Sequence, residues 1–173
     1  LEQETRLFKW STLFKSLRLM ELSGEVIGGR FFEGIPGIQF ISRSALHLLK
    51  YDYKKEPVYW MAAKDPASLC GVKIKGQELP SRLKTTSLVF KGTKPVLICK
   101  RGGKIIEFKV PPDDPRMDEY LQIFKTMLCR DQNPLSSIVI EKINDRPAAR
   151  SPYKNVFRNS FDTYLQMSTL VIQ

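Results

Sequence analysis

The stretch that decides the fold runs from residue 86 to residue 110 and reads TSLVFKGTKPVLICKRGGKIIEFKV. It contains three short runs rich in β-branched and aromatic residues: Thr86–Phe90, Pro95–Lys100 and Ile105–Val110. Each pair of runs is separated by a short segment with glycine, which supplies the positive φ that tight hairpins require. The stretch therefore predicts three antiparallel strands in an up-and-down meander.

Two helices are predicted after the meander. Arg116–Arg130 carries apolar residues at positions i, i+3 and i+4 for more than three turns. Ser151-Pro152 offers an N-cap followed by proline at the first position of a second, shorter helix. Both helices have an apolar face, which predicts that they pack on the core.

Further strands are predicted around these elements. Val58–Ala63 is an apolar run suited to a buried strand. Ser137–Ile143 is predicted to be a strand with a short partner at Arg146–Ala149, and Tyr164–Ile172 is predicted to close the chain as one strand. We therefore expect a β-rich region that is a strongly twisted sheet or a partly open barrel with two helices.

The chain before residue 51 has a helical period instead. Ser11 is positioned to cap a helix that ends at Ser23-Gly24. Glu25–Phe32 and Ile38–Ile41 then predict a hairpin, and Ser44–Lys50 predicts a second helix. Helix, hairpin and helix in this order are typical of the end of a winged-helix unit, in which the hairpin is the wing.

The change of period falls in the polar segment Tyr51–Pro57. It predicts a boundary between a winged-helix-like part, residues 1–54, and a β-rich part, residues 55–173. The expected fold class is α+β. At 173 residues the chain is long enough for one domain or two small ones.

The charge of the chain indicates a polyanionic partner. The 28 Lys and Arg against 18 Asp and Glu give a net charge of +10. The segment Val72–Lys109 holds ten bases and two acids, so it carries +8 of that excess. Neutralisation of phosphates by such bases drives nucleic-acid affinity, whereas the alternative is a solvated basic surface that maintains solubility.

Composition also excludes other classes of protein. Hydrophobic residues make up 42% and charged residues 27%, which excludes global disorder. The longest apolar runs are too short to span a bilayer, and Leu1-Glu2-Gln3-Glu4 does not resemble a signal peptide. We expect a cytoplasmic protein with no membrane partner, and a first residue other than Met suggests a fragment of a longer chain.

The candidate nucleic-acid-binding residues are bases that can contact phosphates and an aromatic residue that can stack on a base. They are Trp10, Arg30, Arg43, Lys73, Lys75, Arg82, Lys84, Lys91, Lys94, Arg101 and Lys104. The turns 91–94 and 101–104 should lie at opposite ends of the meander, with Lys109 near the first and Lys84 near the second. Tyr59 and Trp60 could also stack on bases, but core packing is the expectation for Trp60 and the alternative for Trp10.

No catalytic constellation is apparent in the sequence. A GxxxxGK[ST] phosphate-binding loop is absent, and His47 is the single histidine. Cys70, Cys99 and Cys129 are isolated, without the clustered ligands that a zinc site needs. We therefore expect no catalytic residue, metal site or cofactor in this chain, and binding is favoured over catalysis.

Three blocks of sequence resemble one known family. The residues Met20–Val26, Gly29–Phe32 and Gly34–Phe40 resemble the glycine-rich signature in the C-terminal region of the Lhr (large helicase-related) family of superfamily two helicases. Ala62–Gly71 resembles the next block, with Ser68 where the family has asparagine. Ile140–Ala148 with Ser151-Pro152 resembles the closing block, with Asp145 where glycine is common.

The resemblance implies a parent protein that uses ATP and Mg²⁺ to translocate along single-stranded DNA and unwind DNA or RNA:DNA duplexes in DNA repair. Its two motor domains would precede Leu1. This chain would be the accessory, DEAD/H-associated C-terminal region, with single-stranded DNA or an RNA:DNA hybrid and the motor domains as partners. The alternatives are a DNA-base glycosylase-like module and a protein-interaction scaffold.

Overall fold

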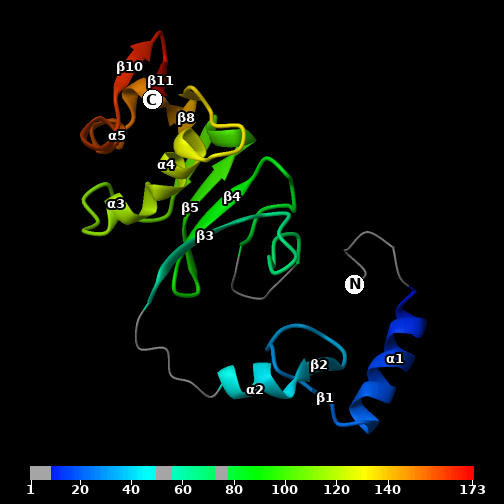
Figure 1. The fold of residues 1–173 in the computed structure, drawn as a ribbon. Coiled ribbons are helices and arrows are strands. Elements are labelled where there is room, and N and C mark those ends of the chain that lie inside the picture. The colour runs from blue at the N-terminus through cyan, green and yellow to red at the C-terminus, as the bar shows by residue number, and fades with distance from the viewer. Residues whose placement is uncertain (1–8, 50–55, 73–77) are drawn as a thin grey trace. The chain divides into compact units, whose positions relative to one another are not determined.

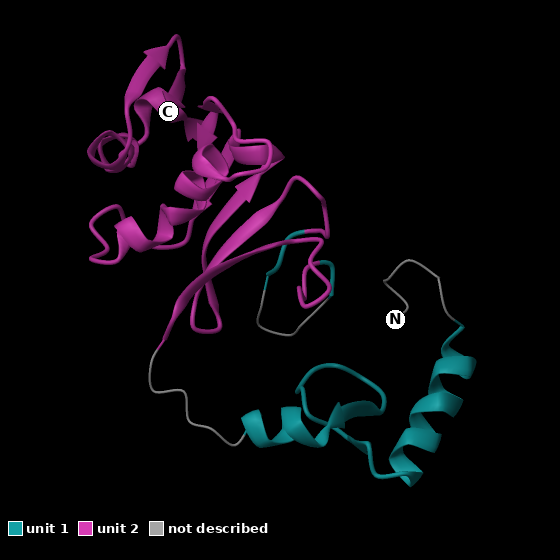
Figure 2. Cartoon of the chain, in the orientation of Figure 1, with its two compact units in different colours: residues 1–54, 71–80 teal, residues 55–70, 81–173 magenta. Residues whose placement is uncertain are grey.

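The computed structural model describes residues 9–49, 56–72 and 78–173 (Figure 1). The chain divides into two compact units (Figure 2). Unit 1 contains residues 1–54 and 71–80, and unit 2 contains residues 55–70 and 81–173. Lys50, the last residue of the predicted second helix, and residues 51–55 of the predicted connection 51–57 lie outside the described residues.

Unit 1 has the predicted order of helix, hairpin and helix. Helix α1 is Trp10–Leu22, strands β1 (Val26–Gly29) and β2 (Gln39–Ser42) pair antiparallel, and helix α2 is Arg43–Leu49. The predicted cap at Ser11 is wrong. The backbone N–H groups of residues 12 and 13 both donate to the carbonyl of residue 9, so the helix begins before Ser11.

The C-terminal end of α1 follows the prediction. Gly24 adopts a φ of +79°, and the N–H of Glu25 donates to the carbonyl of Met20 at 2.9 Å. This is the bonding pattern of a glycine-terminated helix. The guanidinium of Arg43 then donates to the carbonyl of Gly24 at 2.8 Å, which ties the start of α2 to the end of α1.

The side chain of Gln39 holds the loop of the wing. Its Oε1 accepts hydrogen bonds from the N–H groups of Phe31 and Phe32, each at 2.8 Å. Its Nε2 donates to the carbonyls of Phe32 and Ile35, each at 3.1 Å. One amide thus satisfies four backbone groups of a loop that β-pairing leaves open.

Unit 2 contains a six-stranded mixed sheet. Its order is β3-β4-β5-β6-β8-β9, and all neighbours are antiparallel except β6 and β8. The strands are β3 Val58–Ala62, β4 Ser87–Lys91, β5 Lys94–Lys100, β6 Ile105–Phe108, β8 Lys142–Ile143 and β9 Arg146–Pro147. The predicted meander is confirmed as β4, β5 and β6.

The parallel junction of β6 and β8 is extended by one side chain. The N–H of Asn144 donates to the carbonyl of Ile106 at 2.9 Å. Its Oδ1 accepts the N–H of Phe108 at 2.7 Å, and its Nδ2 donates to the carbonyl of the same residue at 3.1 Å. The amide therefore continues the ladder where the strand itself has ended.

A second sheet contains three strands in the order β10-β11-β7. These are β10 Thr163–Gln166, β11 Thr169–Ile172 and β7 Ile138–Ile140. The single closing strand predicted for 164–172 is wrong, because Met167 adopts a φ of +53° and the chain reverses there into a hairpin.

The predicted strand 137–143 is divided between the two sheets. The N–H groups of Glu141 and Lys142 both donate to the carbonyl of Lys104, at 2.8 and 3.1 Å. The two donors lie where the chain passes from β7 of one sheet to β8 of the other. The described strands of unit 2 form one six-stranded and one three-stranded sheet, and they form no closed barrel.

Helices α3 (Met117–Tyr120) and α4 (Gln122–Cys129) replace the single helix predicted for 116–130 and lie beside β3 to β5 (Figure 1). They are separated at Leu121, whose φ of −76° and ψ of −9° leave the regular helical path. Helix α5 is Lys154–Ser160 and begins three residues after the predicted cap. A 3₁₀ turn, η1 (Arg101–Gly103), joins β5 to β6, and a second, η2 (Ala148–Arg150), follows β9.

The core of unit 2 lies between its sheets and helices. Phe108 stacks on Tyr153 at a centroid distance of 4.4 Å, and Phe157 contacts Phe124 edge-on at 5.5 Å. These rings come from β6, α4, α5 and the segment before α5, so they join the elements that were predicted to pack together. No helix within the described residues is long and apolar enough to cross a bilayer.

Candidate nucleic-acid interface

The two basic turns of the meander lie at opposite ends of β5, as expected. Lys91 and Lys94 flank the β4–β5 turn, and the N–H of Lys109 donates to the carbonyl of Val96 near that end. At the other end, the N–H of Gly102 donates to the carbonyl of Thr85 at 2.9 Å. This hydrogen bond places the second basic turn beside the segment that carries Lys84.

Acidic residues offset the positive charge at the end that carries the β4–β5 turn. The ammonium of Lys91 lies 3.8 Å from Glu56, and that of Lys109 lies 3.8 Å from Glu107. Arg116 donates two hydrogen bonds to Glu119, at 2.9 and 2.8 Å. This end is a cluster of mixed sign, so it offers less positive potential than its bases alone suggest.

The Arg116–Glu119 pair affects the titration of both partners. The hydrogen bonds from the guanidinium lower the pKa of the Glu119 carboxyl, and the same bonds raise the pKa of Arg116. Both groups therefore keep their charges near neutral pH. Arg116 also donates to the carbonyl of Glu56 at 2.8 Å, which fixes the start of β3 next to α3.

At the end of the meander that carries the β5–β6 turn, three of the predicted binding residues lie in one region. Lys84 and Arg101 are exposed, and Lys104 makes an ion pair with Glu141 at 3.3 Å. Backbone conformation shapes the turn, because Arg101, Gly102 and Gly103 have φ values of +52°, +66° and +104°. We call Lys84 together with residues 100–104 the basic turn region.

Two further candidates, Arg82 and Arg43, bind backbone carbonyls, and two lie outside the described residues. Arg82 donates to the carbonyl of Asp65 at 2.9 Å and so holds the loop after β3. Arg43 bonds Gly24 within unit 1, as described above. Lys73 and Lys75 lie outside the described residues.

Arg30 and Trp10 are exposed in unit 1. Arg30 lines a shallow hollow of about 350 Å³ with residues of the wing. The indole of Trp10 is 44% exposed and lies 5.7 Å, centroid to centroid, from the ring of Phe14. Trp10 is therefore accessible to a partner, and its predicted stacking role stays a prediction.

Two aromatic residues of the strand predicted for 58–63 are exposed. Strand β3 is an edge strand, and Tyr59 and Trp60 are 39% and 45% exposed. The prediction of a buried strand at 58–63, with Trp60 in the core, is wrong because β3 has a neighbour on one side only. Tyr59 stacks on Phe90 of β4 at 5.3 Å.

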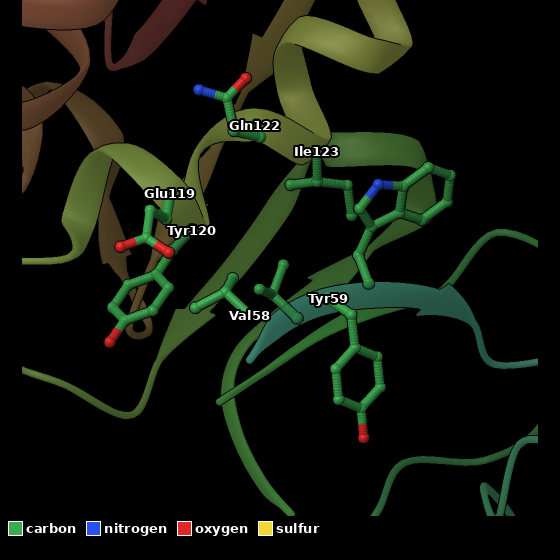
Figure 3. Close-up of a pocket in the computed structure, with 8 residues that line it drawn as sticks. Val58, Tyr59, Glu119, Tyr120, Gln122 and Ile123 are labelled. Carbon is green, nitrogen blue, oxygen red and sulfur yellow. The ribbon is translucent and has the colours of Figure 1, made fainter. Parts of the chain in front are cut away.

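A pocket of about 190 Å³ lies between β3 and the helices α3 and α4 (Figure 3). Val58, Trp60 and Ile123 contribute apolar walls, and Glu119 contributes a carboxylate. Figure 3 shows Tyr59 directed to the other side of β3 from Ile123. The edge strand thus presents an aromatic residue on each face.

The block at Ala62–Gly71 is a compact loop. Oδ1 of Asp65 accepts the N–H of Ala67 at 2.8 Å, and the Oγ of Ser68 accepts the N–H of Cys70 at 3.2 Å. Ser68 is 5% exposed. Its hydroxyl therefore satisfies a local backbone donor, which an asparagine side chain at this position could also do.

The described residues hold no group of three or more His, Cys, Asp or Glu side chains that could bind a metal ion. The arrangement is therefore one of exposed cations, exposed aromatic rings and a small pocket. Such surfaces bind single-stranded nucleic acid by phosphate contacts and base stacking.

Comparison with known proteins identifies the N-terminal part. Residues 1–61 match the family model for the winged-helix domain of the large helicase-related protein. Residues 1–61 are thus similar to the winged-helix domain of Lhr proteins. The predicted resemblance to Lhr proteins and the predicted α+β class are confirmed.

A curated relative extends the similarity to the β-rich part. The Lhr helicase/uracil glycosylase of Escherichia coli (strain K12) is 28% identical to this chain over 156 residues. The match covers 83% of this chain and 10% of the relative. The chain thus spans about a tenth of the length of the Lhr protein that it matches.

Proposed function

We propose that this chain is an accessory region of an ATP-driven helicase and binds a single strand of DNA, or of an RNA:DNA hybrid, through the basic turn region. Its winged-helix domain is of the type found in Lhr proteins. The observation that carries the proposal is the grouping of Lys84, Arg101 and Lys104 at one end of the meander.

The chemistry of the basic turn region suits a phosphate backbone. Arg101 and Lys84 are exposed, and their side chains extend from backbone that the hydrogen bond between Gly102 and Thr85 holds in place. Arginine and lysine can each neutralise a phosphate and release its counterions. A contact of this kind depends on charge and spacing, so we expect little preference for base sequence.

A pair of charge-neutralising substitutions tests the proposal. Arg101→Ala with Lys104→Ala should lower affinity for a labelled single strand several-fold at low salt. The slope of log K against log salt should flatten by roughly one unit for each lost phosphate contact. The matched control is Lys125→Ala with Arg158→Ala, which removes the same charge from exposed positions of α4 and α5.

Unchanged affinity in the Arg101/Lys104 variant would show that the bases serve solubility alone. An equal loss in the control variant would show that net charge, and not this region, determines binding. Thermal unfolding of both variants at the wild-type temperature confirms that the fold is intact.

We also propose that ATP and Mg²⁺ are bound by motor domains of the parent protein and not by this chain. The sequence lacks a phosphate-binding loop, which is consistent with this division. The purified chain should therefore show no magnesium-dependent ATP hydrolysis above background. Turnover that persists through rigorous purification would contradict the assignment. Contact with the motor domains, a role in DNA repair and a cytoplasmic location belong to the same proposal.

A base-glycosylase activity is the second candidate. It is supported by the name of the E. coli relative, which couples helicase with uracil glycosylase. The two candidates differ in what they do to a uracil-containing strand without ATP. A glycosylase releases free uracil and leaves an abasic site, whereas the accessory region binds the strand unchanged.

A further inference from the structure

The indole of Trp60 is exposed without an aromatic partner. Its neighbour Tyr59 stacks on Phe90, with an interplanar angle of 12°. Trp60 lies opposite Val89 in the β3–β4 ladder and lines the pocket beside Ile123. Among the described residues no aromatic ring packs against this indole, and its exposure of 45% makes it accessible to a planar ligand.

The size of the pocket limits what can enter it. Its volume of about 190 Å³ is below the roughly 300 Å³ at which sites for drug-sized ligands begin. Its apolar walls favour a flat ring over an extended polar group. The pocket therefore has room for one ring system.

The polar groups of the pocket favour a base over a phosphate. Glu119 lines it, and the two hydrogen bonds from Arg116 keep this carboxylate charged. The pairing with Arg116 leaves little net charge here to attract a phosphate, and the oxygens of Glu119 can still accept a hydrogen bond from an amino group, as a carboxylate does from the amine of cytosine.

We infer that this pocket holds one unpaired nucleobase, stacked on Trp60, with an amino-bearing base favoured by Glu119. The inference rests on the proposed function, because it assumes that the strand reaches unit 2. It adds a second, uncharged component of binding. Stacking on an aromatic side chain releases no counterions, so it is separable from the contribution of the basic turn region.

Fluorescence of Trp60 gives a direct test. The chain has two tryptophans, so Trp10→Phe leaves Trp60 as the one indole emitter. A single strand of deoxycytidines should quench this emission as it binds. A strand of equal length with abasic spacers keeps the phosphates and should leave the emission unchanged.

Substitution tests the energetic contribution. Trp60→Ala should weaken binding of the deoxycytidine strand about fivefold or more, with an unchanged salt slope. Trp60→Phe should retain part of the affinity and serves as the control for folding. Tyr164→Ala, which removes another exposed aromatic side chain of unit 2, should have no effect. Glu119→Gln should reduce the preference for deoxycytidine over thymidine strands.

The possible failures are distinguishable. Full affinity in Trp60→Ala, together with unquenched emission, would overturn the base pocket and leave the proposed strand binding intact. A wild-type chain that binds no strand at any salt concentration would overturn both.

Discussion

At the scale of single residues, the polar side chain of Gln39 stabilises the loop of the wing in unit 1. Its amide makes four hydrogen bonds to the loop that closes the wing. Gln39→Leu should loosen this loop, because it removes the acceptor of the N–H groups of Phe31 and Phe32, at a cost of about 0.5–1.5 kcal/mol for each lost hydrogen bond. Amide hydrogen exchange at these two residues should accelerate, while exchange at Leu88 and Ile98 in unit 2 should stay slow.

The three cysteines should differ in reactivity. Cys70 and Cys99 are buried, and burial raises the pKa of the Cys99 thiol to about 12. At pH 8 this thiol stays protonated and unreactive, because the thiolate is the nucleophile. A thiol reagent should therefore label Cys129 alone in the native chain and all three cysteines in denaturant, as counted by mass spectrometry. Rapid native labelling of Cys99 would contradict the described packing.

Trp10 provides a comparison with Trp60. It is exposed to a similar degree but belongs to unit 1. Trp10→Ala should weaken strand binding with little change in salt slope if the domain stacks on bases. Titration at two salt concentrations measures both quantities. An unchanged affinity would restrict stacking to unit 2.

The sequence alone predicted where glycines with positive φ would form the turns of the meander. The glycines of the two meander turns have the positive φ that was expected, with values from +58° to +104°. It misplaced residues whose environment depends on distant neighbours. Nothing in the run Val58–Ala63 shows that β3 lies at the edge of the sheet, so Trp60 was assigned to the core.

At the scale of elements, the turn η1 packs closely on β7. A Cβ built on Gly103 would lie 2.5 Å from Cγ2 of Ile138, and the φ of this residue is +104°. Gly103→Ala should therefore destabilise the chain by about 1–3 kcal/mol, through both strain and steric overlap. Gly102→Ala is the matched control, because its φ is also positive but its added Cβ has open space. Thermal unfolding should show the larger loss for Gly103→Ala.

At two places the apolar pattern of the sequence did not predict where a helix or strand ends. The predicted helix 116–130 has one continuous apolar stripe, yet the chain leaves the helical path at Leu121 and resumes it. The closing segment 164–172 is apolar at both ends but reverses at Met167. In both cases the apolar pattern is compatible with two geometries, and packing in the tertiary structure selects one.

At the scale of the whole molecule, apolar burial is distributed unequally. Every buried apolar side chain in the described part of the chain, except Val26, belongs to unit 2. Residues 55–173 expressed alone should therefore unfold cooperatively, whereas residues 1–54 alone should lack a cooperative transition. Circular dichroism during heating compares the two fragments. A cooperative transition in the short fragment would contradict this ranking.

The parallel junction between β6 and β8 also has a consequence for the order of folding. Residues 106 and 144 are far apart in sequence, and the contact between Asn144 and Phe108 spans 36 residues. The antiparallel meander of β4 to β6 needs short-range loop closures alone, so we expect it to form first. Strand β8 can add to it only after the helices between them have been positioned. During synthesis on the ribosome, the sheet is thus incomplete at first, and the β6 edge stays unpaired until β8 has been synthesised.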